Sequence, residues 1–193
     1  MSQRLRGFRS VVIDNEDGMM QIVSHLHGLG HRNIAYIGGD SMFYNSIERR
    51  KAFIAAMNSC GLPVREELIS TFGWSEQEAA RMAEVILMKH PEVTAICAVN
   101  DRMADTVIRT LRARGIRIPE DISVTGFGFA DFSAPLSVPL TTVKIDHTHF
   151  ARELLNALLL EIETPWQNPS TVFVETELIC RSSTGIASLH SPR

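Results

Sequence analysis

Polar side chains follow several predicted strands at the point where each strand ends. They are Asn15, Asp40, Ser75, Asn100 and Asp101, and Trp74 and the glycine–phenylalanine stretch 126–129 stand at corresponding places. In an open parallel sheet, the loops after the carboxyl ends of the strands meet at one crevice, where ligands bind. Carboxylate, amide and guanidinium groups hydrogen-bond hydroxyl-rich ligands, and an aromatic ring offers a face for stacking. The spacing therefore predicts a crevice for a small polar ligand of the sugar type.

Strand-like and helix-like spacings of apolar residues alternate along the chain. We predict strands over residues 11–13, 34–37, 68–72, 95–99, 122–124 and 172–180, and helices over 18–29, 45–60, 75–87, 101–115 and 147–163. Repeated strand–helix units imply an α/β fold with a doubly wound parallel sheet and helices on both faces.

Helix ends are predicted from local signals. Asn45 with Glu48, and Ser75 with Glu78, have the spacing of capping boxes. Gly30 is expected to close the first helix as a left-handed cap. Residues after Gly185 are polar and are expected to form a loose tail.

Composition limits the classes of protein to consider. The chain has 193 residues, a formal net charge of −3 and ordinary hydrophobic (45%) and charged (21%) contents, so no basic field favours nucleic acid. Three scattered cysteines fit reduced thiols in the cytoplasm. No apolar run is long enough to span a bilayer, and the first ten residues lack a signal-peptide pattern. We therefore expect a cytoplasmic protein without a membrane segment.

Catalytic and metal-binding motifs are missing from the sequence. It contains no phosphate-binding loop, zinc-protease helix or dinucleotide fingerprint, and residues 73–75 do not continue into a nucleophile elbow. The pairs His25/His27 and His147/His149 would present their rings on different helix faces and have no third ligand at suitable spacing. We expect no metal, no cofactor and no enzymatic activity.

Three segments together carry a family resemblance. Residues 118–146 read IPEDISVTGFGFADFSAPLSVPLTTVKID, residues 95–104 read AICAVNDRMA, and residues 29–39 read LGHRNIAYIGG. They resemble the effector-binding core of lactose-repressor/galactose-repressor (LacI/GalR) transcription regulators, in that family's order and across most of the chain.

The resemblance implies a two-lobed fold of the periplasmic-binding-protein-like type I class. Residues 27–146 and 169–184 would form a complete C-terminal lobe, residues 1–26 and 147–168 part of the N-terminal lobe, and 185–193 a flexible tail. The crossings between lobes are expected near residues 14–16, 143–146 and 168–171. The family's helix-turn-helix headpiece has no counterpart here, so operator DNA would be bound only through a headpiece absent from this chain.

The resemblance also assigns site residues. Arg49 stands where the family has a sugar-binding arginine, although Ala52 replaces its usual glycine. Trp74 matches an aromatic that packs against the effector in some members. Asn100 would contact ligand hydroxyls, and Asp101 would cap the next helix.

The end of the 122–124 strand departs from the family. Most members place aspartate after Gly126-Phe127, whereas this chain has Gly128 and then Phe129, so the usual acceptor carboxylate is missing unless Asp131 takes its place. His147 stands where members often present a side chain at the pocket edge. An arginine that loses its carboxylate is costly to bury unless a ligand anion pairs with it. We therefore predict that the effector is an anion, such as a sugar acid, rather than a neutral sugar.

Each of these residues also has a purely structural interpretation. Arg49 could be a solvated charge on the first turn of a helix, and Trp74 and Phe129 could be core residues. Asn100 and Asp101 could simply end a strand and cap a helix. These alternatives stay open at the level of sequence.

The sequence thus predicts an effector-sensing domain of a transcription regulator, which acts by ligand-linked closure of two lobes. We expect it to bind a sugar or sugar acid and to form a homodimer, as family members commonly do. Two alternatives are a stand-alone or periplasmic-type sugar-binding protein and a small α/β enzyme. The coding sequence upstream of Met1 would separate the first two.

Overall fold

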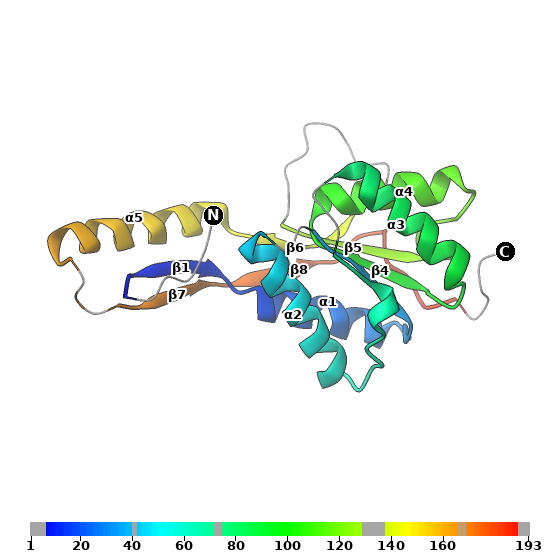
Figure 1. Cartoon of the computed structure of the whole chain (residues 1–193), viewed down its shortest axis with the longest axis horizontal. Helices are drawn as coiled ribbons and strands as arrows, with labels where there is room; N and C mark the ends of the chain where they lie inside the picture. The colour runs from blue at the N-terminus through cyan, green and yellow to red at the C-terminus, as the bar shows by residue number, and fades with distance from the viewer. Residues whose placement is uncertain are drawn as a thin grey trace.

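The computed structural model describes residues 7–39, 42–71, 75–128, 138–165, 167 and 169–188. These residues form two sheets: one of six strands in the order β3-β2-β4-β5-β6-β8, and one of two strands, β1 and β7. Figure 1 shows the six-stranded sheet with its helices on one side of the molecule, and the two-stranded sheet extending away from it. We call these the larger and the smaller body.

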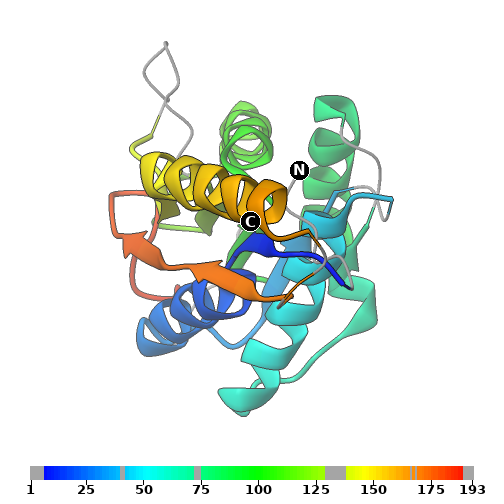
Figure 2. The same ribbon diagram turned by 90° about the vertical axis from the view of Figure 1, so that its left-hand side faces the viewer.

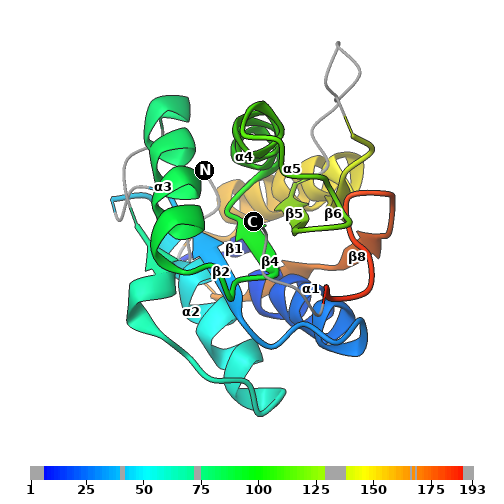
Figure 3. The same ribbon diagram turned by 90° about the vertical axis from the view of Figure 1, so that its right-hand side faces the viewer.

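The larger body is a doubly wound sheet, as expected. Its strands β2 (Ile34–Ile37), β3 (Ile69–Ser70), β4 (Ala95–Ala98), β5 (Ser123–Phe127) and β6 (Thr141–Ile145) are parallel, and β8 (Thr176–Ile179) pairs antiparallel with β6. Helices α1 (Asn15–Gly28) and α2 (Tyr44–Ser59) cover one face, and α3 (Glu76–Lys89) and α4 (Asp101–Ala113) cover the other (Figure 3).

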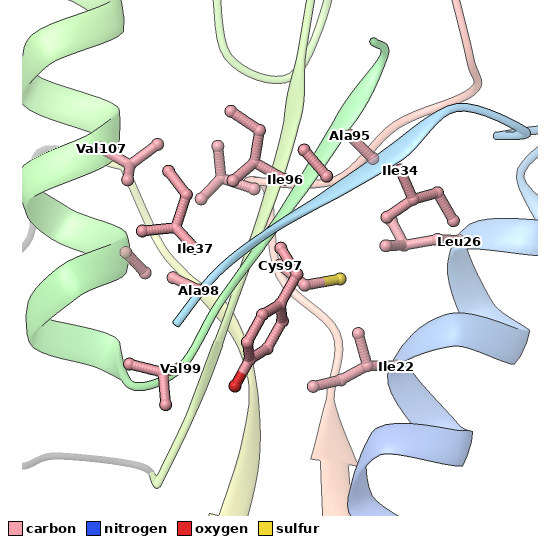
Figure 4. Close-up of a cluster of buried hydrophobic side chains, with 14 of the residues drawn as sticks. Ile22, Leu26, Ile34, Ile37, Ala95, Ile96, Cys97, Ala98, Val99 and Val107 are labelled. Atoms are coloured by element: carbon pink, nitrogen blue, oxygen red, sulfur yellow. The ribbon is translucent and has the colours of Figure 1, made fainter. Parts of the chain in front are cut away.

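The core lies on both faces of the central strands β2 and β4. Every residue of these two strands is buried, which is typical of parallel strands covered by helices on both sides. Figure 4 shows Ile22 and Leu26 of α1 on one side of the sheet and Val107 of α4 on the other. Cys97 lies between them, and burial raises the pKa of its thiol to about 12, so this cysteine stays protonated.

The smaller body consists of β1 (Ser10–Ile13), β7 (Thr171–Val174) and α5 (His147–Glu163). The two strands pair in parallel, with Ser10 opposite Thr171, and α5 lies across one face of them (Figure 2). Arg9 forms hydrogen bonds with the end of α5. Its Nη1 donates to Glu161 Oε2 at 2.9 Å, and its Nη2 donates to Thr164 Oγ1 at 2.9 Å.

The chain passes between the two bodies three times, at Asp14, Asp146 and Glu175. Asp14 and Asp146 each cap the helix that follows, accepting from Asp17 N at 3.0 Å and His149 N at 2.8 Å. The first two of these positions fall within the expected ranges 14–16 and 143–146. The third lies after residues 168–171, because β7 pairs with β1 before β8 joins β6, so the single strand predicted over 172–180 is two strands.

Some of the predicted helix ends are confirmed by the structure, and others are not. Ser75 caps α3 through Glu78 N at 3.1 Å, and Gly30 has a φ of +93°, so both signals are confirmed. The capping box at Asn45 is wrong, because α2 begins one residue earlier, after Phe43, whose side chain makes no cap hydrogen bond. Helix α1 begins at Asn15 and packs on α2 and β8, which places it with the larger body rather than in an N-terminal unit ending at residue 26.

The segment after Gly185 is bound to the larger body, contrary to the expected loose tail. Ala187 N donates to Leu29 O at 2.9 Å. The Gly185 carbonyl lies 3.0 Å from Nε2 of His31, a buried residue whose Nδ1 lies 2.9 Å from Thr94 Oγ1. Since a carbonyl only accepts, Nε2 carries the proton and Nδ1 accepts from the threonine hydroxyl.

His31 predicts a loss of stability in acid. Burial lowers the pKa of its imidazole, with the Gly185 carbonyl acting in the opposite direction. The unfolded ring therefore binds a proton that the folded ring does not, so the free energy of unfolding should be full above about pH 6.5 and fall below it. Urea titrations at pH 7.5, 6.5 and 5.5 should show a shallower decline for His31→Gln. Burial also lowers the pKa of His25, so some decline should remain, but equal slopes would contradict the prediction.

Helix α5 exposes large apolar side chains on the side turned away from β1 and β7. Leu155, Leu158 and Ile162 are 55%, 56% and 67% exposed, and no residue of α5 is buried. In the part of the chain that is described, no helix is long and apolar enough to cross a bilayer. A contiguous apolar surface of this kind favours association in water.

We expect the 193-residue chain to self-associate through α5. Replacing Leu155 and Leu158 together by glutamine should shift sedimentation-velocity profiles toward the monomer, because both side chains belong to the exposed stripe. Met88 on α3 is 74% exposed and isolated, so Met88→Gln should leave the profile unchanged. A monodisperse monomer of the parent chain would contradict the expectation.

Close packing makes Gly126 the most constrained position of β5. A Cβ at this position would overlap Asp101 Oδ1 and lie 2.8 Å from Leu140 Cδ2. Gly126→Ala should therefore destabilise the fold by about 2–3 kcal/mol through overpacking. Gly28→Ala in α1, where a Cβ would meet nothing within 4 Å, should be neutral or slightly stabilising. Denaturant titrations of both variants measure the difference, and equal stabilities would refute the role of Gly126.

Candidate functional site

Arg49 is the centre of the polar residues at the carboxyl edge of the larger sheet. Its side chain lies on the buried face of α2 and is only 5% exposed. Nε donates to Asn15 Oδ1 at 2.9 Å, and Nη1 donates to the Val99 carbonyl at 2.8 Å. One guanidinium thus joins the first crossing between the bodies to the end of β4.

An aromatic face supports the same guanidinium. The Cζ of Arg49 lies 3.9 Å from the centre of the Phe127 ring at the end of β5, a cation–π geometry. Gly18 in the first part of α1 makes room for this ring, because a Cβ there would lie 2.6 Å from Phe127 Cε2. The position of Arg49 therefore depends on α1, β4 and β5 together.

The charge of Arg49 is buried without an ion pair to any carboxylate among the described residues. Burial lowers the pKa of its guanidinium to about 10, while Tyr36 and Asp101 act to raise it. At neutral pH the group is still a cation. Hydrogen bonds to neutral acceptors reduce the cost of burying it but do not neutralise it.

Asn100 takes the capping role that was expected of Asp101. Asn100 is the N-cap of α4, and its Oδ1 accepts from Met103 N at 2.9 Å. Asp101, which was expected to cap, is the first residue of the helix and is 3% exposed. It accepts the hydroxyl of Thr142 from β6. Asn100 has an extended backbone, so its side-chain oxygen reaches the amide three residues later.

Of the remaining predicted site residues, the structure describes Asn15 and His147. Asn15 is 6% exposed and bound to Arg49. His147 is exposed at the start of α5, with Nε2 3.4 Å from the Gly128 carbonyl after β5. Trp74 and Phe129 lie outside the described residues. The structure thus brings Asn15, Arg49, Asn100 and Asp101 to one edge, with His147 at the far end of the same edge.

Sequence reasoning missed two groups of this edge, the Val99 carbonyl and the Tyr36 side chain. Phe127 falls within the predicted stretch 126–129, but its contact with Arg49 was not foreseen. Val99 directly follows β4, so a rule that includes the first residue after each strand could have found it. Tyr36 lies within β2, where an apolar strand gives no signal of a polar role.

A hollow of about 270 Å³ adjoins this edge between the two bodies. Asp14 and Asn15 line it from the first crossing, Glu48 and Lys51 from α2, and Phe173 from β7. Asn15 therefore faces both the hollow and Arg49. No group of three or more metal-ligating side chains occurs among residues that the structure describes.

Comparisons with known proteins agree with this fold. A family described as periplasmic binding protein-like domain matches residues 23–184. The HTH-type transcriptional regulator AscG of Escherichia coli (strain K12) is 31% identical over 186 residues, which are 95% of this chain and 55% of that protein. DegA of Bacillus subtilis (strain 168), also an HTH-type transcriptional regulator, is 40% identical over 136 residues, 69% of this chain and 39% of its own length.

Among solved structures, the transcriptional regulator CelR in complex with cellobiose superposes with a TM-score of 0.85 at 29% identity, covering 92% of this chain and 54% of that one. The chain spans about half the length of the curated relatives it matches. The chain therefore belongs to the periplasmic binding protein-like family and corresponds to the effector-binding domain of LacI/GalR-type regulators.

Proposed function

We propose that this chain is the effector-sensing domain of a LacI-type DNA-binding transcription regulator and that its effector is a sugar or sugar acid. The observation that carries the proposal is the buried Arg49 cation at the carboxyl edge of the sheet, bonded to Asn15 and to the end of β4. Donors held in this way bind hydroxyl or carboxylate oxygens without reorganising. CelR, whose solved structure contains cellobiose, supports a carbohydrate ligand.

Each predicted site residue has a role in this proposal. Arg49 donates to the effector, and the amide of Asn100 that is not used in capping reaches a hydroxyl. Asp101 holds the start of α4 against β6 through Thr142. Trp74 and Phe129 supply apolar faces, and His147 closes the edge.

The mechanism follows from the position of Asn15. This residue is the first of α1, directly after the crossing at Asp14, and its side chain is bound to Arg49 of α2. An effector that engages Arg49 changes the free energy of this contact, which lies next to the first crossing. The arrangement of the bodies that binds the effector better then gains population, by no more than the difference in affinity.

The remaining parts of the proposal concern the whole protein. We infer two lobes, the larger body being the C-terminal lobe and the smaller body a part of the N-terminal lobe. We also infer a homodimer in the cytoplasm, without enzymatic activity, that meets operator DNA through a headpiece outside this chain. Relatives named as HTH-type transcriptional regulators support this reading.

Isothermal calorimetry of the chain against hexoses, disaccharides, aldonates and hexuronates tests the proposal. We expect saturable binding of at least one class. Arg49→Met should weaken it about 10- to 100-fold, because hydrogen bonds from a charged group contribute about 1.5–3 kcal/mol. Arg114→Met removes an exposed arginine of the larger body and should bind like the parent. A folded Arg49→Met protein with undiminished affinity would rule out this site.

A further inference from the structure

Two buried hydroxyl groups near Arg49 have no hydrogen-bond partner within the described residues. They are Oη of Tyr36, a residue that is 0% exposed, and Oγ of Ser46, which is 3% exposed. Leaving such a group unpaired costs about 1–3 kcal/mol. Two such groups close to a buried cation therefore indicate a polar ligand atom that accepts their hydrogen bonds.

Geometry brings both hydroxyls to the side of α2 that carries Arg49. Ser46, Arg49 and Phe53 share the buried face of this helix. The Tyr36 ring stacks on Phe53, with 5.0 Å between ring centres and 26° between ring planes. The same ring reaches toward the carboxyl end of β2, since a Cβ on Gly38 would lie 2.9 Å from its Cε1. Arg49 and Tyr36 are close enough to perturb each other's pKa values.

A positive charge, that of Arg49, acts on the Tyr36 hydroxyl. Arg49 donates its two hydrogen bonds through Nε and Nη1, and no described residue accepts a hydrogen bond from Nη2. The first turn of α2 contains no acidic residue, and its N-terminus lies at the same edge of the sheet. A helix N-terminus and a guanidinium both favour an anion.

Asp101, the carboxylate whose field acts on Arg49, forms its hydrogen bond elsewhere. Asp101 raises the pKa of Arg49 through its field, but it forms no ion pair with the guanidinium. Its Oδ1 instead accepts the Thr142 hydroxyl. Among the described residues, no carboxylate thus forms an ion pair with the Arg49 guanidinium, which leaves this interaction to a ligand anion.

We propose that the effector of this domain carries a carboxylate or phosphate, and that Arg49, Ser46 and Tyr36 together bind this anionic group. The inference rests on the proposed function and narrows it to an anionic class of effector. Arg49 would bind the anion through its remaining N–H groups, while the two hydroxyls donate directly or through one water. The hydroxyl of a neutral sugar could satisfy one of these groups but would leave the cation unbalanced.

Thermal denaturation of the 193-residue chain provides the test. The probes are inorganic phosphate, glucuronate, glucose 6-phosphate and glucose, each compared at constant ionic strength with sodium chloride as the balance. At least one anion should raise the melting temperature in a saturable manner, with an affinity at least 10-fold above that of glucose. Glucuronate and glucose 6-phosphate separate a carboxylate from a phosphate on the same ring.

Two variants make the test specific. Tyr36→Phe and Ser46→Ala should each weaken anion binding about 3- to 10-fold, as expected for one hydrogen bond to a charged group. They should leave the melting temperature without ligand unchanged or higher, because each removes a buried unpaired hydroxyl. If either hydroxyl only stabilised the fold, its removal would instead lower the melting temperature measured without ligand. Thr125→Val removes a buried hydroxyl within β5 and should not change binding.

The outcomes separate this inference from the broader proposal. Anion affinities in Tyr36→Phe and Ser46→Ala equal to those of the parent chain would overturn the inference. So would anions that stabilise the chain no better than glucose. If glucose or another neutral sugar binds and Arg49→Met abolishes that binding, the proposed effector-sensing function is supported. The inference that the effector is an anion is then rejected.

Discussion

A single buried cation organises the functional edge of this protein. The guanidinium of Arg49 is excluded from water, and burying a charge is costly unless its donors find acceptors. Asn15 and Val99 provide the acceptors, and the Phe127 ring provides an electron-rich face. Three segments that are distant in sequence must therefore be folded together before the Arg49 charge can be buried. The geometry of the crevice thus depends on all three segments.

Small residues allow these segments to approach. Gly18 leaves room for the Phe127 ring against α1, and Gly126 leaves room for Asp101 against β5. In both cases the absent side chain creates space for a polar or aromatic group that faces the crevice. The sheet edge is thus formed by close backbone contacts, and the polar side chains occupy the positions that these contacts leave.

Much of the fold could be predicted because its signals are local. The apolar runs of β2 and β4 and the serine cap of α3 depend on neighbouring residues alone. Tertiary contacts decided the rest. β7 and β8 are separate strands because β7 pairs with β1 and β8 pairs with β6 in different sheets. The burial of Asp101 against Thr142 is likewise a contact between segments distant in sequence. The role of Tyr36 could not be inferred, since a tyrosine inside an apolar strand reads as core until its hydroxyl is seen without a partner.

The short link at Glu175 has a mechanical consequence. Only this residue separates β7 of the smaller body from β8 of the larger body. A single residue offers two rotatable backbone angles, whereas the peptide planes on either side are stiff. The two sheets are thus joined by a nearly continuous ribbon, which resists being stretched or sheared but yields to torsion. Relative motion of the bodies should therefore be a twist about this ribbon, with Asp14 and Asp146 following it as the other two pivots.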